Sequence, residues 1–212
     1  MTSPRMRYRE QVRDEVKEHA WAQVATSGAS ALSLNAIAKQ MGISGPALYR
    51  YFRNRDELIT ELVLDAYRDL AATARAAATP KDPRARLTAV AAAMRAWALE
   101  APHRYLLIYG TPVPGYAAPP EATEAARDLM SVLLDGFTAL PDGSPSTLNS
   151  HLDRHRAWSP DETAAAAALR RALVFWTRLH GVVSLEVAGH FTGMGFDPQL
   201  LFAAEVAAAI DA

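Results

Sequence analysis

The sequence predicts an all-α protein, in which an amino-terminal three-helix unit with a helix-turn-helix corner precedes a larger helical bundle. Two observations support this fold class. Apolar residues recur at spacings of three and four in successive segments, which is the period of a helix with one buried face. Proline, glycine and capping residues separate these segments. The chain has 212 residues and is half apolar, so it is long enough to bury a substantial core.

The amino-terminal segment predicts a helix from about residue 6 to residue 27. Val12, Val16, Ala20 and Val24 repeat every four residues, and Gly28 follows as a stop. This helix is expected to pack across the two helices that come next.

The segment 33–52 has the pattern of two short helices joined by a tight turn. Ser33 and Ser44 are placed to cap the two helices through their hydroxyl groups. Gly42 suits the left-handed end of the first helix, and Pro46 suits the first turn of the second. A short helix held in such a corner can enter the major groove of DNA.

The second short helix separates inward from outward residues. Leu48 and Phe52 lie four apart and are expected to point to the interior. The outward positions then carry small and polar side chains, which allow close approach to DNA: Ser44, Gly45, Ala47, Tyr49 and Arg50.

Four groups of residues keep a characteristic spacing in this region: Ile37-Ala38, Gly42-Ile43-Ser44, Leu48-Tyr49-Arg50-Tyr51-Phe52 and Asn54-Arg55-Asp56-Glu57-Leu58. Together they resemble the DNA-binding domain of the TetR family of transcriptional regulators. The resemblance implies a sequence-specific regulator of double-stranded operator DNA, usually a homodimeric repressor that a small molecule releases. Arg55 stands where the family usually has a phosphate-contacting lysine. The expected DNA-binding residues are Ser33, Ser44, Gly45, Pro46, Ala47, Tyr49, Arg50, Tyr51 and Arg55.

Composition excludes several function classes. The chain has no cysteine, which removes disulfides, thiolate metal sites and cysteine nucleophiles. It has no apolar run of the roughly 18 residues that a membrane span needs, no glycine-rich phosphate loop and no Gly-x-Ser-x-Gly elbow. We therefore expect a cytoplasmic protein without cofactor, catalytic residues or membrane association.

Charge is distributed unevenly along the chain. Residues 1–60 hold nine lysines and arginines against six acidic residues, whereas the remainder is acidic. A basic amino-terminal part suits contact with phosphate at one end of the protein, although the excess is small. Arg5, Arg7 and Arg9 either reach a neighbouring phosphate or minor groove or form a solvated tail.

The domain boundary is expected around a long helix. Residues 1–55 form the predicted DNA-binding domain, a helix over about 55–78 links it to the body, and residues 79–212 form a ligand-binding and dimerisation domain. Further helices are expected at about 87–101, 103–109 and 120–140. A loop with room for a helical turn is expected over 141–158.

Two long helices complete the predicted body. Ser159-Pro160-Asp161-Glu162 reads as a helix start, with the helix running to about Gly189, and Asp197-Pro198 starts the last helix. Both helices carry apolar residues on two sides. One side suits the body and the other a second subunit, so we expect a homodimer through these two helices.

A second resemblance lies in the body. Trp176-Thr177-Arg178-Leu179-His180-Gly181 is similar to the Trp-His-Gly signature of one carboxy-terminal class of TetR-family proteins, which suggests ligand control without naming the ligand. The residues expected to line a pocket for a small, mostly apolar effector are Met94, Trp97, Tyr105, Tyr109, Met130, Phe137, Trp176 and His180. If they fill a solid core instead, the alternative is a DNA-binding regulator that responds to a protein partner or to nothing.

Metal binding is not expected. His151 and His155 have the spacing of two ligands on a helix, but they lie in a polar stretch that suits a solvated segment. Glu186 and His190 are similarly spaced, yet the apolar faces lack the further acids that a bridged metal pair would need.

Overall fold

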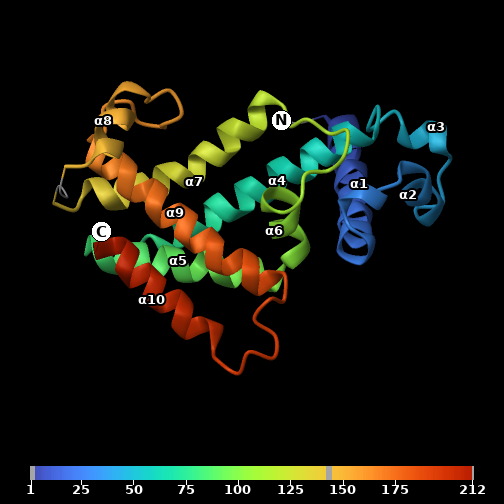
Figure 1. Ribbon diagram of the computed structural model, residues 1–212. Helices are drawn as coiled ribbons and strands as arrows, with labels where there is room; N and C mark the ends of the chain where they lie inside the picture. Colours follow the sequence, from blue (N-terminus) through green and yellow to red (C-terminus); the bar gives the residue numbers. More distant parts are fainter. Residues whose placement is uncertain (1–2, 142–144, 212) are drawn as a thin grey trace. The chain divides into compact units, whose positions relative to one another are not determined.

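The computed structural model describes residues 3–141 and 145–211, and within these ranges it contains helices and no strand (Figure 1). The predicted all-α fold is confirmed. No helix in the described ranges is long and apolar enough to cross a membrane. The helices are α1 (Pro4–Ser27), the short 3₁₀ helix η1 (Ala29–Ala31), α2 (Leu34–Gln40), α3 (Gly45–Leu48), α4 (Arg55–Ala77), α5 (Pro83–Glu100), α6 (Pro102–Tyr109), α7 (Pro120–Thr138), α8 (Thr147–Arg154), α9 (Ala166–Val187) and α10 (Pro198–Asp211).

The chain forms two compact units that do not follow a single cut in the sequence. The first unit contains Met1–Ala66 together with Pro102–Ala122, and the second contains Tyr67–Ala101 together with Thr123–Ala212. The short helix α6 therefore packs in the same unit as the helix-turn-helix segment.

The first unit is built on α1, which contacts η1, α2 and α6. Val16, Ala20 and Val24 are buried on its inner face, as their four-residue repeat predicts. The carboxamide of Gln23 accepts a hydrogen bond from the backbone N–H of Ser33 at 3.0 Å, which fixes the start of α2 against α1. This contact sets the place of the helix-turn-helix pair.

The second unit is organised around α9, which packs against α5, α8 and α10 (Figure 1). Arg95 of α5 pairs with Glu186 of α9, with Nε and Oε2 2.8 Å apart, and it also donates to the side chain of Gln199 on α10. Because this ion pair is largely buried, it is screened little by salt and holds three helices together. Phe137 of α7 and Phe175 of α9 meet edge to face, with ring centroids 5.3 Å apart.

The predicted helix start at residues 159–162 is wrong, because α9 begins only at Ala166. The polar side chains make a local turn instead. The Ser159 hydroxyl accepts from the Asp161 N–H at 3.1 Å, and the Asp161 carboxylate accepts from the Thr163 N–H at 2.8 Å. Arg156 donates to the carbonyl of Ala164, so the backbone is engaged outside a helix. Ser and Asp side chains compete with the helix in this way.

The predicted loop over 141–158 contains two helical turns, the helix α8, more than the single turn expected. The Ser146 hydroxyl caps this helix by accepting from the Asn149 N–H at 3.1 Å. Its one buried side chain is Leu152. Residues 142–144 of the predicted loop lie outside the described residues.

The two apolar sides expected on α10 differ in burial. Phe202, Val206 and Ile210 are buried within the chain, whereas Ala204 and Ala208 on the other side are exposed. Asp197 caps the helix as predicted, because its carboxylate accepts from the Gln199 N–H at 2.8 Å.

Candidate DNA-binding site

The helix-turn-helix corner has the geometry that its sequence predicts. The Ser33 hydroxyl accepts from the Ala36 N–H at 3.3 Å and caps α2. Gly42 has φ of 66°, a left-handed conformation that favours glycine because a Cβ would be strained there. The chain turns at this residue, and the Ile43 N–H donates to the Ala38 carbonyl at 3.0 Å.

The cap expected from Ser44 is only partly present. Ser44 occupies the cap position of α3, but its side chain makes no capping hydrogen bond. Its hydroxyl is exposed at the start of α3, where it can meet a ligand instead. The capping prediction is therefore wrong for the hydroxyl and right for the position.

The recognition segment consists of α3 and the turn that follows it. Leu48 and Phe52 are fully buried, as predicted, and they anchor the segment from beneath. Gly45 lies close to α2, because a Cβ built there would stand 3.3 Å from Oδ1 of Asn35. Small residues thus allow α2 and α3 to pack closely.

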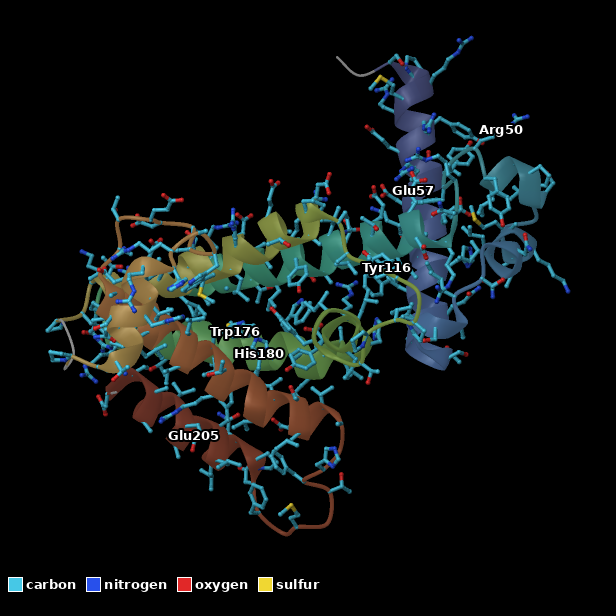
Figure 2. All side chains as sticks on the ribbon, turned by 45° about the horizontal axis from the view of Figure 1, so that its top comes forward. Arg50, Glu57, Tyr116, Trp176, His180 and Glu205 are labelled. Carbon is cyan, nitrogen blue, oxygen red and sulfur yellow. The ribbon has the colours of Figure 1, made fainter. Side chains whose placement is uncertain are left out.

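The outer surface of this segment carries the expected side chains. Tyr49 is 44% exposed, and Arg50, labelled in Figure 2, is exposed beside it. Ser44 and Pro46 are also exposed, whereas the remaining expected residues are half-buried: Ser33, Gly45, Ala47, Tyr51 and Arg55. An aromatic ring, a guanidinium and a hydroxyl therefore share one short surface that can contact base edges and phosphates.

Arg13 holds this segment in place and was missed by the sequence reasoning. Its guanidinium donates to the carbonyl of Tyr51, lies 4.2 Å from the ring centroid of Phe52 and pairs with Glu61 of α4 at 3.0 Å. One side chain of α1 thus joins the end of the recognition segment to α4. The i,i+4 periodicity of α1 could not reveal this role, because Arg13 lies beside the buried stripe and reads as a surface residue.

Arg55, the expected phosphate contact, makes hydrogen bonds inside the protein. Its Nη2 donates to the carbonyl of Ala29 at 2.9 Å and to that of Ser30 at 3.2 Å. Asn54 caps the same end of α4, because its Oδ1 accepts from the Glu57 N–H at 2.8 Å. The side chain of Arg55 therefore fixes η1 to α4 in the DNA-free protein.

The carboxylate of Glu57 supports the same turn. Burial opposes its ionisation, but hydrogen bonds from the backbone and side chain of Arg53 and the charges of Arg53 and Arg13 outweigh that effect. Its pKa is held below the ordinary value of 4.5, so Glu57 is ionised at neutral pH.

One of the three amino-terminal arginines contacts the recognition segment. Arg5, Arg7 and Arg9 are exposed, and Nη2 of Arg9 donates to the carbonyl of Arg50 at 3.3 Å. Arg9 therefore adds positive charge beside Arg50.

Comparison with known families matches both parts of the chain. Residues 18–62 match the model described as bacterial regulatory proteins of the tetR family. Residues 87–209, more than half of the chain, match the model described as a tetracyclin repressor-like C-terminal domain. The chain belongs to the TetR family. Members of this family are transcriptional regulators that bind DNA, not enzymes.

Individual relatives agree with this assignment. An HTH-type transcriptional regulator of Mycobacterium tuberculosis, Rv1816, is 34% identical over 93% of this chain and 90% of its own length. The crystal structure of the regulatory protein SCO4313 is 59% identical, covers 99% of this chain and 100% of its own, and has a TM-score of 0.91. The TetR-family regulator PfmR of Thermus thermophilus shares the fold at 17% identity over 92% of this chain and 97% of its own, with a TM-score of 0.57.

In this TetR-family chain, the residues expected to line an effector pocket are divided between the two units. Tyr105 and Tyr109 belong to the first unit, where their ring centroids lie 5.3 Å apart. The other expected residues belong to the second unit: Met94, Trp97, Met130, Phe137, Trp176 and His180.

Burial differs within the second-unit set. Met94, Trp97 and Phe137 are buried, and Nε1 of Trp97 donates to Oδ2 of Asp69 at 2.9 Å. Trp176 and His180 are half-buried on α9, with ring centroids 4.9 Å apart (Figure 2). Burial lowers the pKa of His180 to about 4, so this imidazole is neutral at physiological pH.

The histidine and acidic pairs weighed as metal ligands have other contacts. The rings of His151 and His155 stack at 4.2 Å, and Nδ1 of His155 lies 2.8 Å from the carbonyl of His151. Glu186 is paired with Arg95, and His190 is exposed. Within residues 3–141 and 145–211, no group of three histidine or acidic side chains is placed to hold a metal ion.

Proposed function

We propose that this TetR-family regulator is a homodimeric repressor that reads operator DNA with α3 and the turn after it. The observation that carries the proposal is the exposed surface of Tyr49 and Arg50 on a segment anchored by Leu48, Phe52 and Arg13. Residues 1–55 are the proposed DNA-binding domain, and residues 79–212 the proposed effector and dimerisation domain. Two recognition segments related by a two-fold axis would read half-sites about 34–36 Å apart or slightly more.

The DNA contacts can be tested after an operator has been selected from random duplexes with the full-length protein. Arg50→Ala and Tyr49→Ala should weaken binding to that operator by about 1–3 kcal/mol each where the side chain reads a base. Where the side chain contacts a phosphate, its removal should instead weaken binding to all sequences. It should also reduce the salt slope, the steepness with which the logarithm of affinity falls with the logarithm of salt concentration, by about one.

The matched control for this test is Arg75→Ala. It removes the same charge from an exposed residue in the second unit, near Asp128. Operator affinity should be unchanged in this variant. Full affinity in the Tyr49→Ala, Arg50→Ala double variant would refute the assignment of the recognition surface.

Dimerisation is supported by an exposed apolar surface on α9 and α10. Leu185 is 45% exposed, Gly181 four residues before it on α9 is exposed too, and Ala188 directly after the helix is also exposed. Ala204 and Ala208 are exposed on α10. Arg178 of α9 lies 4.0 Å from Glu205 of α10, which Figure 2 labels. Small residues allow two copies to approach closely, and a surface of this kind suits a two-fold interface.

The substitution that tests the interface must lie on this exposed surface. Leu185→Glu should leave the fold of one chain intact and shift sedimentation from dimer to monomer. Val183→Glu should instead destabilise the fold of a single chain. Val183 is 4% exposed, so the carboxylate of the introduced glutamate would be buried within the same chain. A Leu185→Glu protein that sediments as a dimer would place the interface elsewhere.

Release by a small, mostly apolar effector is supported by Trp176 and His180 on α9 and by the buried aromatic residues of the same unit. A screen for molecules that release the protein from its operator tests this step. Trp176→Ala or His180→Ala should reduce effector affinity and release together, because both follow from the same differential binding. Unchanged release in both variants would show that the effector binds elsewhere. If no small molecule shifts operator affinity, the result favours the alternative that a protein partner controls DNA binding.

A further inference from the structure

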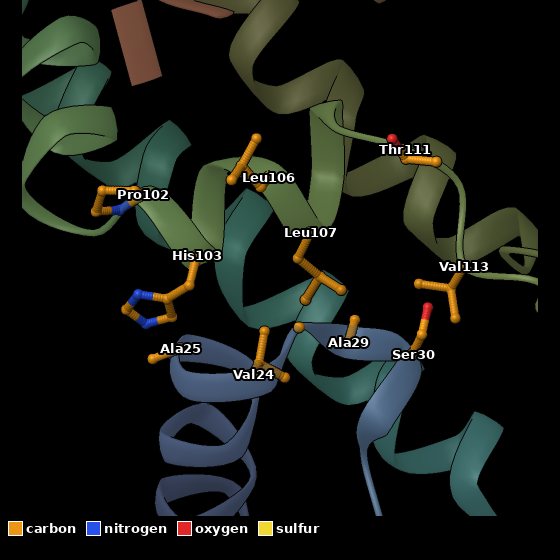
Figure 3. A pocket seen from close by; sticks show the side chains of 11 residues that line it. Val24, Ala25, Ala29, Ser30, Pro102, His103, Leu106, Leu107, Thr111 and Val113 are labelled. Atoms are coloured by element: carbon orange, nitrogen blue, oxygen red, sulfur yellow. The ribbon is translucent and has the colours of Figure 1, made fainter. Parts of the chain in front are cut away.

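A cleft of about 420 Å³ lies within the first unit, where the end of α1 and η1 face α6 (Figure 3). It is lined by Val24 and Ala25 of α1, by Leu106 and Leu107 of α6, and by Val113 of the loop that follows α6. Figure 3 shows the side chains of Val24 and Leu107 directed toward one another. Leu106 is 42% exposed, so apolar surface is uncovered at this cleft.

Three polar side chains from separate segments stand among these apolar residues. They are Ser30 of η1, His103 of α6 and Thr111 of the loop after α6. Ser30 and Thr111 are exposed and His103 is half-buried, so all three side chains are accessible from solvent. The cleft therefore combines apolar walls with a few converging polar groups, which is the usual composition of a small-molecule site.

The charge of the lining limits the ligand. Of the described residues that line the cleft, none is a lysine, an arginine or a carboxylate. Burial lowers the pKa of His103, and the positive charge of Arg104 lowers it further, so the ring is neutral at physiological pH. A charged ligand would lose hydration here without gaining an ionic partner, whereas an uncharged one would not.

The walls are held by contacts outside the cleft. The ring of His103 meets Trp21 edge to face at 5.7 Å, and the guanidinium of Arg104 lies 5.3 Å from the Trp21 ring. On the opposite wall, Arg55 holds the carbonyls of Ala29 and Ser30. A preformed site loses less free energy on binding than one that must be ordered by its ligand.

We propose that this cleft binds a small, uncharged, mostly apolar molecule that carries one hydrogen-bonding group, such as an aromatic ring with a hydroxyl. The apolar part lies between α1 and α6, and the hydroxyl reaches Ser30, His103 or Thr111. The site consists of residues of the first unit alone, so it is distinct from the Trp176 and His180 site. It requires neither DNA binding nor effector control.

The test is a methyl NMR titration of the full-length protein with 2-naphthol as the probe. Saturable shifts are expected for the methyl signals of Val24, Leu106 and Leu107. The anion 2-naphthoate has the same ring system, and it should bind at least about tenfold more weakly. Equal affinity for the two probes, or no saturable shift with 2-naphthol, would overturn the proposal.

Variants locate the site. Ala25→Trp adds a ring at an exposed position that lines the cleft and should weaken 2-naphthol binding at least about tenfold. Ala22→Trp is the matched control, because Ala22 is an exposed alanine of α1 outside the lining, and its affinity should equal that of the parent chain. Thr111→Trp fills the cleft from the loop and should repeat the Ala25→Trp result.

Two other outcomes would also overturn the proposal. One is unchanged 2-naphthol affinity in both filling variants, since the probe would then bind elsewhere. The other is a shift of the same methyl signals with protein concentration in the absence of probe, since a second copy of the chain would then cover the cleft.

Discussion

His180 provides a pH-dependent test of how helix α9 is packed. Burial lowers the pKa of this imidazole from 6.5 to about 4. Its ring lies edge to face against Trp176, with centroids 4.9 Å apart. In the unfolded chain the same group recovers its ordinary pKa, so between the two values the unfolded state binds a proton that the folded state does not.

The sign and size of the effect follow from this difference. Above about pH 6.5 His180 is neutral in both states and does not change the free energy of unfolding. As the pH falls from about 6.5 toward about 4, protonation favours the unfolded chain and stability is lost. One pKa unit corresponds to about 1.4 kcal/mol, so His180 should lower the free energy of unfolding by about 2 kcal/mol between about pH 7.5 and about pH 5.

Urea unfolding at these two pH values measures the loss, and His180→Gln isolates it. Glutamine keeps a polar side chain that does not titrate, so the variant should lose about 2 kcal/mol less than the parent chain over the same interval. His103, whose pKa is also lowered, contributes equally to the pH dependence of both proteins. Glu57, whose pKa lies below 4.5, loses its contribution only at lower pH. Equal losses in the two proteins would show that the pKa of His180 is not lowered in the folded protein.

Three further predictions concern stability. Arg13→Met should lower the free energy of unfolding by about 2 kcal/mol in urea unfolding and weaken operator binding, because charge-assisted hydrogen bonds to Tyr51 and α4 are lost; unchanged operator affinity would contradict the positioning role. Gly136→Ala should lower the free energy of unfolding by about 1–3 kcal/mol in urea unfolding, because the added Cβ would stand 2.6 Å from Cδ2 of Leu87. An unchanged free energy of unfolding would mean that the Leu87 side chain moves aside freely. Arg95→Met should cost about 3–5 kcal/mol by leaving Glu186 buried and unpaired, whereas Arg95→Met combined with Glu186→Gln should recover part of it.

The helix-turn-helix corner could be predicted closely because each of its features is local. The cap at Ser33 acts on Ala36, the left-handed conformation at this corner belongs to Gly42 alone, and the buried pair Leu48 and Phe52 is four residues apart. The hydrogen bond from the Glu57 N–H to the Asn54 side chain is equally local. Interactions between neighbours in sequence depend on few other parts of the chain, so the sequence alone constrains them.

The features that the sequence does not predict involve either two local structures that compete for the same residues or contacts between residues far apart in the chain. Ser159 to Glu162 has the residues of a helix start, but the same serine and aspartate also stabilise a turn, and Arg156 selects the turn by binding its carbonyls. Which of the two forms depends on an arginine outside the motif. The contacts of Arg13 with Tyr51 and of Arg95 with Glu186 join residues 38 and 91 positions apart, and no spacing rule indicates them.

The sequence pattern also could not predict where α6 packs. Its apolar and aromatic residues predict a short helix but do not say which surface it covers. In the structure α6 contacts α1 and belongs to the first unit, with Tyr105 buried there. The aromatic character of Tyr105, Tyr109 and Trp176 groups them as candidate pocket residues, but it carries no information on which unit each of them joins.

Arg55 shows how an internal contact changes the expected role of a basic residue. Its position predicts a phosphate contact, yet its guanidinium holds the carbonyls of Ala29 and Ser30 in the DNA-free protein. To reach a phosphate it would have to exchange these bonds, so its substitution affects η1 whether or not it touches DNA. The salt slope separates the two roles. If Arg55→Ala lowers operator affinity while the slope stays that of the parent chain, Arg55 positions α4 and η1; a slope reduced by about one means that it neutralises a phosphate. We expect an unchanged slope for Arg55→Ala and, where Arg50 meets a phosphate, a reduced slope for Arg50→Ala, because the guanidinium of Arg50 is exposed.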